Sequence, residues 1–225
     1  MAFAEIDTER LRHFRERGFA PHLIFDIGAS DGAWSASVAE VFPDSRYHLF
    51  EPLADEEASY RELLTQRLHS HPRWTLHRVA LGSTEGFVDF RQATHACGST
   101  SLPVDSCDGL FRTLRLPQTT LDTVIDTCGE VPALVKMDIQ GGELDALEGL
   151  QRHLDKVELL LLETWLSRSY GGINPLLLDV MNHLAPRGFF PIDLADAYRD
   201  ERGNLISQDV FFVNRASPLA KDYSF

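Results

Sequence analysis

An apolar strand that ends in an acid and opens into a turn of small residues restricts this chain to few folds. The segment reads Leu23-Ile-Phe-Asp-Ile-Gly-Ala-Ser-Asp-Gly32, and its small residues let the backbone turn tightly and let a ligand approach the next helix. A second apolar strand, Tyr47-His-Leu-Phe-Glu51-Pro52, also ends in an acid. In a doubly wound sheet, an acid at this place commonly accepts hydrogen bonds from the two hydroxyls of a ribose. Together the two segments predict a nucleoside pocket.

Hydrophobic periodicity along the rest of the chain predicts strands and helices in alternation. Strands are expected at residues 22–27, 46–50, 74–80, 133–139 and 157–162, with an added strand at 87–90. Helices are expected within residues 1–20 as a lead-in, from Trp34 as far as Pro43, and at 54–68, 119–129, 142–154 and 174–184. The chain is expected to end in a β-hairpin of residues 188–193 and 208–213, with a turn at 202–204.

These elements predict an α/β fold of three layers, αβα. Its sheet is expected to be Rossmann-like, seven-stranded and mostly parallel, and to be closed by the antiparallel C-terminal β-hairpin. Residues 92–118 are polar and too many for an ordinary connection, so we expect a long loop over the site. The 225 residues suit a single domain, 1–225, because no linker is visible.

Charge and cysteine content narrow the function classes. The formal net charge of -13 argues against a nucleic-acid backbone or an anionic membrane surface as a partner. Cys97, Cys107 and Cys128 lack the Cys-x-x-Cys spacing of a zinc site, and we expect reduced thiols. The N-terminus carries acids that do not fit a signal peptide, and no run approaches the ~20 apolar residues of a membrane span. A cytoplasmic protein is expected.

Four segments in order resemble the FkbM-type family of class I S-adenosylmethionine-dependent methyltransferases. They are Phe25-Asp-Ile-Gly-Ala-Ser-Asp-Gly32, Phe50-Glu-Pro52, Thr120-Leu-Asp122 and Val135-Lys-Met-Asp-Ile-Gln-Gly-Gly-Glu143. The resemblance extends from residue 22 to residue 213 and implies S-adenosylmethionine (SAM) as the cofactor and S-adenosylhomocysteine (SAH) as its product. It also implies a small-molecule acceptor.

The resemblance further implies which residues bind the cofactor. The turn after the first strand would hold the methionine end of SAM, Glu51 would accept the ribose hydroxyls, and the end of the third strand would contact adenine. Methionine's carboxylate and ammonium need backbone N–H groups and a carboxylate, which this turn contains. The alternative is a plain strand-to-helix turn with Asp31 as the helix cap. The cofactor-binding residues are expected to be Asp26, Gly28, Ala29, Ser30, Gly32, Glu51, Pro52, Ala80, Leu81, Asp138 and Gln140.

Gln140 is the one departure, because it stands where the family generally has Glu. Glutamine keeps a hydrogen-bonding carbonyl but cannot bind a metal strongly or take up a proton. Asp138, Glu163 and Asn174 carry oxygens of the kind that magnesium binds. Without an acid at position 140, however, no metal is expected.

Methyl transfer to a hydroxyl needs a general base within hydrogen-bond reach of the acceptor. The candidate catalytic residues are Asp138 and Glu163, each at a strand's carboxyl end, and His95 in the polar stretch. The carboxyl ends of strands are where open α/β sheets bind ligands, and histidine has an ordinary pKa near ~6.5. A purely structural ion pair between Asp138 and Lys136 is the alternative for that acid.

We therefore expect an enzyme that transfers the methyl group of SAM to a hydroxyl oxygen of a small molecule, such as a sugar or a secondary metabolite. The alternatives are N- or carboxyl-methyl transfer on the same fold, a NAD-dependent Rossmann oxidoreductase, and a non-catalytic nucleoside-binding module. The oxidoreductase would require Gly-x-Gly-x-x-Gly, where this turn has Gly28, Ser30 and Ala33. The oligomeric state stays open, with a homodimer among the alternatives.

Overall fold

A computed structural model describes residues 5–94, 98–103 and 111–225. In spatial order, the strands of the main sheet are β3 (Trp74–His77), β2 (Arg46–Phe50), β1 (Leu23–Ile27), β7 (Leu134–Met137), β8 (Leu159–Trp165), β10 (Leu205–Asn214) and β9 (Phe189–Arg199). The strands from β3 to β8 run parallel, whereas β10 is antiparallel to both β8 and β9. In this part of the chain the predicted seven-stranded sheet and its closing hairpin are confirmed.

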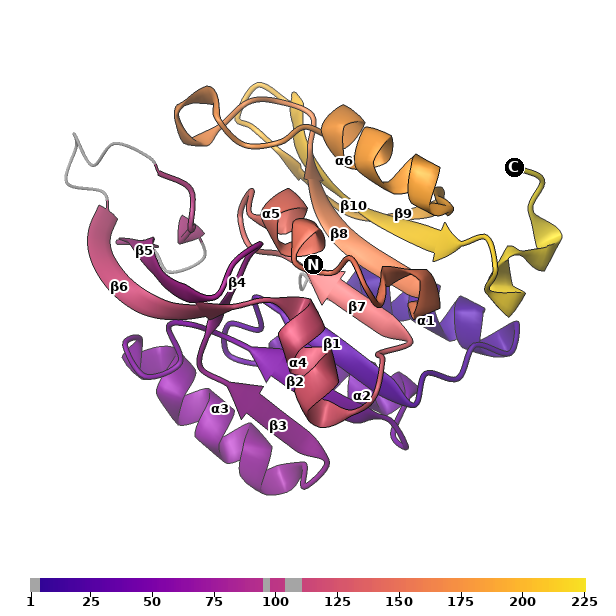
Figure 1. Ribbon diagram of the computed structural model, residues 1–225, viewed down its shortest axis with the longest axis horizontal. Helices are drawn as coiled ribbons and strands as arrows, with labels where there is room; N and C mark the ends of the chain where they lie inside the picture. Colours follow the sequence, from indigo (N-terminus) through magenta and orange to yellow (C-terminus); the bar gives the residue numbers. More distant parts are fainter. Residues whose placement is uncertain (1–4, 95–97, 104–110) are drawn as a thin grey trace.

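Helices cover both faces of this sheet (Figure 1). On one face lie α1 (Glu5–Glu16), α2 (Ala33–Val41) and α3 (Ala58–Ser70), and on the other lie α4 (Leu121–Cys128), α5 (Glu143–Glu148) and α6 (Leu177–Leu184). Every residue of β1 and β7 is buried, as strands covered on both faces must be. The three-layer αβα architecture is therefore confirmed, and α1 is the expected lead-in helix.

A second sheet, beside the first in Figure 1, was not predicted. Its strands, in spatial order, are β4 (Ala80–Leu81), β6 (Phe111–Thr119) and β5 (Gly86–Ala93). The expected strand 74–80 ends earlier, at His77, because Ala80 and Leu81 pair with β6 instead of β2. The expected added strand at 87–90 is the middle of β5.

The second sheet also corrects the expected loop at 92–118. The first residues of this expected loop are the end of β5, and its last residues form β6, which pairs antiparallel with β5. In β6, Leu114 and Leu116 pack toward the core, while Thr113, Arg115 and Pro117 on the opposite face are exposed. This is the alternation of a strand with one wet face, and it was hidden by the polar composition and by Pro117, which argues against a central strand.

Three helix limits also differ from expectation. Helix α5 ends at Glu148 rather than near residue 154, and a Cβ at Gly149 would lie 2.2 Å from the carbonyl oxygen of Gly82. Helix α3 begins at Ala58. Helix α6 begins at Leu177 and not at residue 174, and the N–H of Leu176 donates to the Asp179 carboxylate at 2.9 Å. Nowhere in the described segments is there a helix with both the length and the apolar character to cross a bilayer.

Candidate active site

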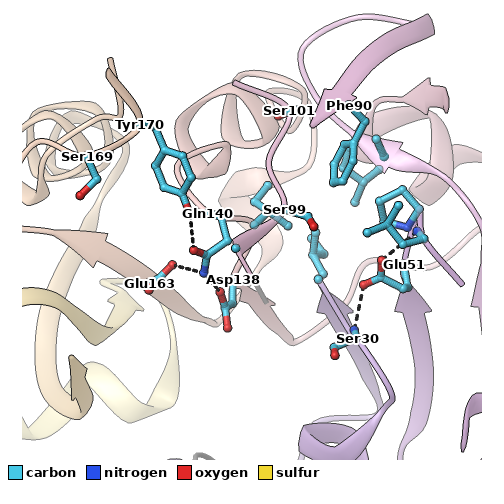
Figure 2. Close-up of a pocket in the computed structure, with 18 of the residues that line it drawn as sticks. Ser30, Glu51, Phe90, Ser99, Ser101, Asp138, Gln140, Glu163, Ser169 and Tyr170 are labelled. Atoms are coloured by element: carbon cyan, nitrogen blue, oxygen red, sulfur yellow. Dashed lines mark hydrogen bonds between the residues drawn. The ribbon is translucent and has the colours of Figure 1, made fainter. Parts of the chain in front are cut away.

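A cavity of ≈ 1070 Å³ lies at the carboxyl ends of the parallel strands, where open α/β sheets bind their ligands. Figure 2 shows Ser30 and Glu51 on one side and Asp138, Gln140, Glu163 and Tyr170 on the other. We call these sides the Glu51 end and the Glu163 end. The Glu51 end comprises Ser30, Glu51, Pro52, Ala80 and Leu81, and the Glu163 end comprises Glu163, Trp165, Tyr170, Asp196 and Asp209.

The carboxylate of Glu51 is held by backbone N–H groups. One oxygen accepts the N–H of Ser30 at 2.9 Å and the other accepts the N–H of Leu53 at 2.8 Å. The residue is 6% exposed, and this burial raises the pKa of Glu51 to about 7, although both backbone hydrogen bonds lower it. Because each oxygen has a second lone pair, the carboxylate can accept both hydroxyls of a vicinal diol.

The walls beside Glu51 are apolar. Pro52, Ala80 and Leu81 line this end of the cavity together with Phe50 and Val79. An apolar slot next to a carboxylate that accepts a diol suits a flat heterocycle attached to a ribose.

The turn after β1 is pressed against the segment that follows β7. Gly28 has φ +76, and a Cβ on it would lie 1.9 Å from the carbonyl oxygen of Asp138. Gly28 and Ser30 line the cavity. Two other residues of this turn, Ala29 and Gly32, are not among the described lining residues. Ala29 is buried, and its N–H donates to the carbonyl oxygen of Phe50. Gly32 directly precedes α2, and a Cβ on it would lie next to the Leu64 side chain.

Asp26, which the sequence predicts to contact the cofactor, is not among the described residues that line the cavity. Its side chain is fully buried, one oxygen lies 3.1 Å from Nζ of Lys136, and the other accepts the hydroxyl of Ser35 at 2.7 Å. Lys136 is the neighbour of Asp26 across the β1–β7 pair, and its Nζ also donates to the carbonyl oxygen of Gly28 at 2.9 Å. Asp26 therefore supports the turn from behind.

A hydrogen-bond network centred on Gln140 joins the candidate catalytic acids (Figure 2). The amide nitrogen of Gln140 donates to Asp138 and to Glu163, both at 2.9 Å. The hydroxyl of Tyr170 donates to the amide oxygen at 2.6 Å, and the hydroxyl of Ser207 donates to the second oxygen of Glu163 at 3.0 Å. Asp138 and Glu163 are separate candidates in the sequence, and in the structure Gln140 links them.

The carboxyl group of Glu163 has a raised pKa in this network. Burial raises the pKa of Glu163 well above its ordinary value, and the negative charges of Asp138, Glu143 and Asp209 raise it further. The structural role of Glu143 is separate, because its carboxylate accepts the N–H groups of Ile139 and Gly141 and shapes the turn after β7.

Several lining residues had not been singled out from the sequence. They are Tyr170, just after β8, and Asp196, Tyr198, Ser207 and Asp209 of the closing hairpin. Asp209 is the one acid within the apolar run of the last strand, and this is the sequence signal that could have identified it as a site residue.

His95 lies outside the described residues. Among the residues that are described, no group of three or more His, Cys, Asp or Glu side chains is arranged to hold a metal ion.

Affinity for SAH is expected to fall as the pH is lowered through about 7, by up to about tenfold per pH unit below that value. The pKa of Glu51 is raised to about 7 in the free protein, and two hydroxyls that donate to this carboxylate would favour its ionised form. Below this pH, binding must first remove a proton. Calorimetric titration with SAH from about pH 5 to about pH 8 measures the slope.

The matched control is Glu51→Gln, which keeps the shape of the side chain and removes its titration. This variant is expected to bind SAH about 10- to 100-fold more weakly near pH 8, because hydrogen bonds to a charged group are lost. Its affinity should vary little with pH. A variant that keeps the wild-type slope would assign the titration to another group, such as Glu143, whose pKa burial also raises to about 7.

The family model of the methyltransferase FkbM domain matches residues 26–190, which is well over half of the chain. Among curated proteins, no sequence matches this chain significantly.

The chain is also similar to solved structures of methyltransferases. Methyltransferase FkbM from Methylobacillus flagellatus KT has 21% identity and a TM-score of 0.54, with 84% of this chain and 43% of that chain covered. An rRNA methylase from Streptococcus thermophilus has 12% identity and a TM-score of 0.52, covering 95% and 97%. Magnesium protoporphyrin IX methyltransferase (ChlM) from Synechocystis PCC 6803, with bound SAM, has 12% identity and a TM-score of 0.50, covering 92% and 78%. The match spans less than half the length of the first of these proteins, and at these identities the likeness concerns the fold.

Proposed function

The chain belongs to the FkbM methyltransferase family, and on this premise we propose that it transfers the methyl group of SAM to a hydroxyl oxygen of a small molecule. Its fold is that of the class I SAM-dependent methyltransferases. The observation that carries the proposal is one cavity with a carboxylate placed for a diol at one end and, at the other, a half-buried carboxylate whose pKa is raised.

The residues at the Glu51 end fit SAM. Glu51 would accept the ribose hydroxyls, and Ala80 and Leu81 would flank the adenine. Gly28 and Ser30 would face the methionine portion. When bound, SAM supplies a methyl group on a positively charged sulfur, and that charge is lost with the methyl. A cationic cofactor suits this cavity, because its described lining residues include acids but no lysine, arginine or histidine.

Glu163 is proposed as the general base. The Glu163 carboxylate would take the proton of the acceptor hydroxyl as that oxygen takes the methyl group from SAM, and the neutral thioether SAH would leave. A base works best when its pKa lies near the working pH, and the pKa of Glu163 is raised in that direction. Ser207 and Gln140 each hold one of its oxygens, so the carboxylate is oriented before the acceptor arrives.

The Glu163 end would position the acceptor. Trp165 and Tyr170 meet edge to face there, with ring centroids 5.5 Å apart, and both line the cavity. Such rings contact the C–H face of a small molecule while Asp138 and Asp209 accept its polar hydrogens. Most of the acceleration in this reaction should come from holding the acceptor oxygen in line with the methyl carbon. A sugar or another hydroxylated metabolite has both a C–H face and polar hydrogens. In this proposal, residues 1–225 would act as one domain.

Transfer to an amine nitrogen is the second candidate, and it is favoured by the excess of acids. Asp138, Glu163, Asp196 and Asp209 all line the cavity. The nearby Lys136 is already paired with Asp26. An acceptor with an ammonium group would offset this negative charge before losing a proton to Glu163.

Binding and transfer test both candidates. SAH is expected to bind by calorimetry and NADH is not. Labelled SAM is then incubated with matched acceptors that differ only in the reacting group, such as glucose and glucosamine. Label on an oxygen of both sugars supports the hydroxyl proposal, whereas label on nitrogen of glucosamine alone selects the second candidate. Binding of NADH without SAH contradicts both.

A further inference from the structure

Gln140 is held in a backbone conformation that a non-glycine residue adopts only when its surroundings stabilise it. Its φ is 56, in the left-handed region that costs such a residue about 1 kcal/mol or more. The hydroxyl of Thr100, from the segment after β5, donates to the Gln140 carbonyl oxygen at 2.8 Å. The turn therefore presents the Gln140 side chain to the Glu163 end of the cavity (Figure 2).

The orientation of the Gln140 amide follows from its partners. Tyr170 donates its hydroxyl proton to the amide oxygen, which leaves the NH₂ group facing Asp138 and Glu163. A flipped amide would place its oxygen against two carboxylates, and both acids would lose a donor. Each of the two amide protons thus serves one acid.

We infer that Gln140 is a positioning residue whose neutral amide joins Asp138 to Glu163 and keeps Glu163 able to take the acceptor's proton. This inference rests on the proposed function, because it concerns the base of that reaction. The side chain acts through Glu163 and not on the reacting atoms.

The charges around Glu163 show why a neutral donor matters at position 140. Negative groups face Glu163 from three elements, with Asp138 after β7, Glu143 on α5 and Asp209 on β10. In the described part of the chain, the hydroxyl of Ser207 on β10 and the amide of Gln140 donate to Glu163, and Tyr170 donates to Gln140. When ionised, a glutamate at position 140, as the family generally has, would add a further negative charge and donate no hydrogen bond. When protonated, it would offer one proton instead of two.

The direct test is Gln140→Glu. Because a like charge at hydrogen-bond distance raises a carboxyl pKa strongly, the acid limb of the kcat profile is expected to move up by about 1–3 pH units. At a fixed pH on that limb, kcat falls about tenfold for each pH unit by which the limb moves, while SAH affinity stays unchanged. The ionisation of Glu163 itself is read without ligand or turnover, from the ¹³C carboxyl resonance that Glu163→Gln removes.

Two further variants separate charge from hydrogen bonding. Gln140→Met has a similar size, removes both donors and adds no charge, so the Glu163 midpoint should move in the same direction by less. Tyr170→Phe frees the amide to flip and should give the smallest change in that midpoint. These variants also keep the inference testable if Gln140→Glu does not fold.

Gln151→Glu is the matched control. Gln151 is exposed, and its amide also donates to a carboxylate, that of Glu148, at 2.9 Å. This variant should leave the Glu163 midpoint and the kcat profile unchanged.

The inference is overturned if Gln140→Glu leaves both the Glu163 midpoint and the kcat profile unchanged. It is also overturned if Gln140→Glu weakens SAH binding alone, which would make Gln140 a cofactor contact. If the wild-type protein methylates no hydroxyl acceptor, the proposed function fails, whereas the carboxyl midpoints still report on the network.

Discussion

Replacing Glu163 with glutamine is expected to lower kcat by about 10²- to 10⁴-fold, which is the usual contribution of a general base. Glutamine keeps the size of the side chain, and its carbonyl oxygen can still accept the Ser207 hydroxyl, but it cannot take up the acceptor's proton. Glu163 lies at the far end of the cavity from Glu51. Affinity for SAH should therefore change little. Single-turnover rates with labelled SAM, together with calorimetric titration of SAH, separate the two effects.

Two variants show whether the loss belongs to Glu163. Glu62→Gln removes one negative charge from the exposed surface of α3 and should leave kcat as in the wild type. Asp138→Asn keeps the contact with Gln140 only by reorganising the amides, so a moderate fall in kcat is expected. If Asp138→Asn shows the large loss and Glu163→Gln does not, Asp138 is the base and our assignment of Glu163 is wrong.

The two acids that end β1 and β2 show how far local sequence predicts the site. Both were expected to bind the cofactor. Glu51 comes after Phe50, the last residue of β2, so it lies in the turn that faces the cavity. Asp26 is still inside β1, before Ile27, and strand alternation directs its side chain toward α2, where Ser35 donates to it. A difference of two residues relative to the strand end, from one before it to one after it, separates a buried support from a lining residue.

Contacts that depend on strand order could not be predicted from spacing. The closing hairpin is visible in the sequence, but the pattern does not show which of its strands lies next to β8. In the structure β10 takes that place, and Asp209 stands opposite Glu163. The ion pair between Lys136 and Asp26 depends in the same way on β7 lying beside β1 in that register. Local periodicity predicts the elements, whereas the charges that tune the site come from their neighbours across the sheet.

Replacing Lys136 with methionine is expected to lower the free energy of unfolding by about 3–5 kcal/mol, because a buried carboxylate would lose its partner. Lys136 is 7% exposed and Asp26 is 0% exposed. Burial alone would lower the pKa of Lys136, but Asp26, Asp138 and Asp209 raise it. Since its pKa is raised on folding, Lys136 contributes fully below the unfolded-state value of ~10.4. The loss should therefore be similar at about pH 6 and about pH 8, as measured by urea unfolding.

The double variant Lys136→Met with Asp26→Asn decides whether the ion pair causes this loss. Residues in direct contact couple by about 0.5–3 kcal/mol, so the double variant should lose less stability than the two single variants together. Additive losses would mean that Lys136 is needed for other neighbours, such as Asp138. Under conditions where Asp26→Asn is folded, its affinity for SAH should stay close to that of the wild type, because Asp26 lies behind the Gly28 turn. A large loss of SAH affinity in the folded variant would instead place Asp26 in contact with the cofactor, as the sequence alone predicted.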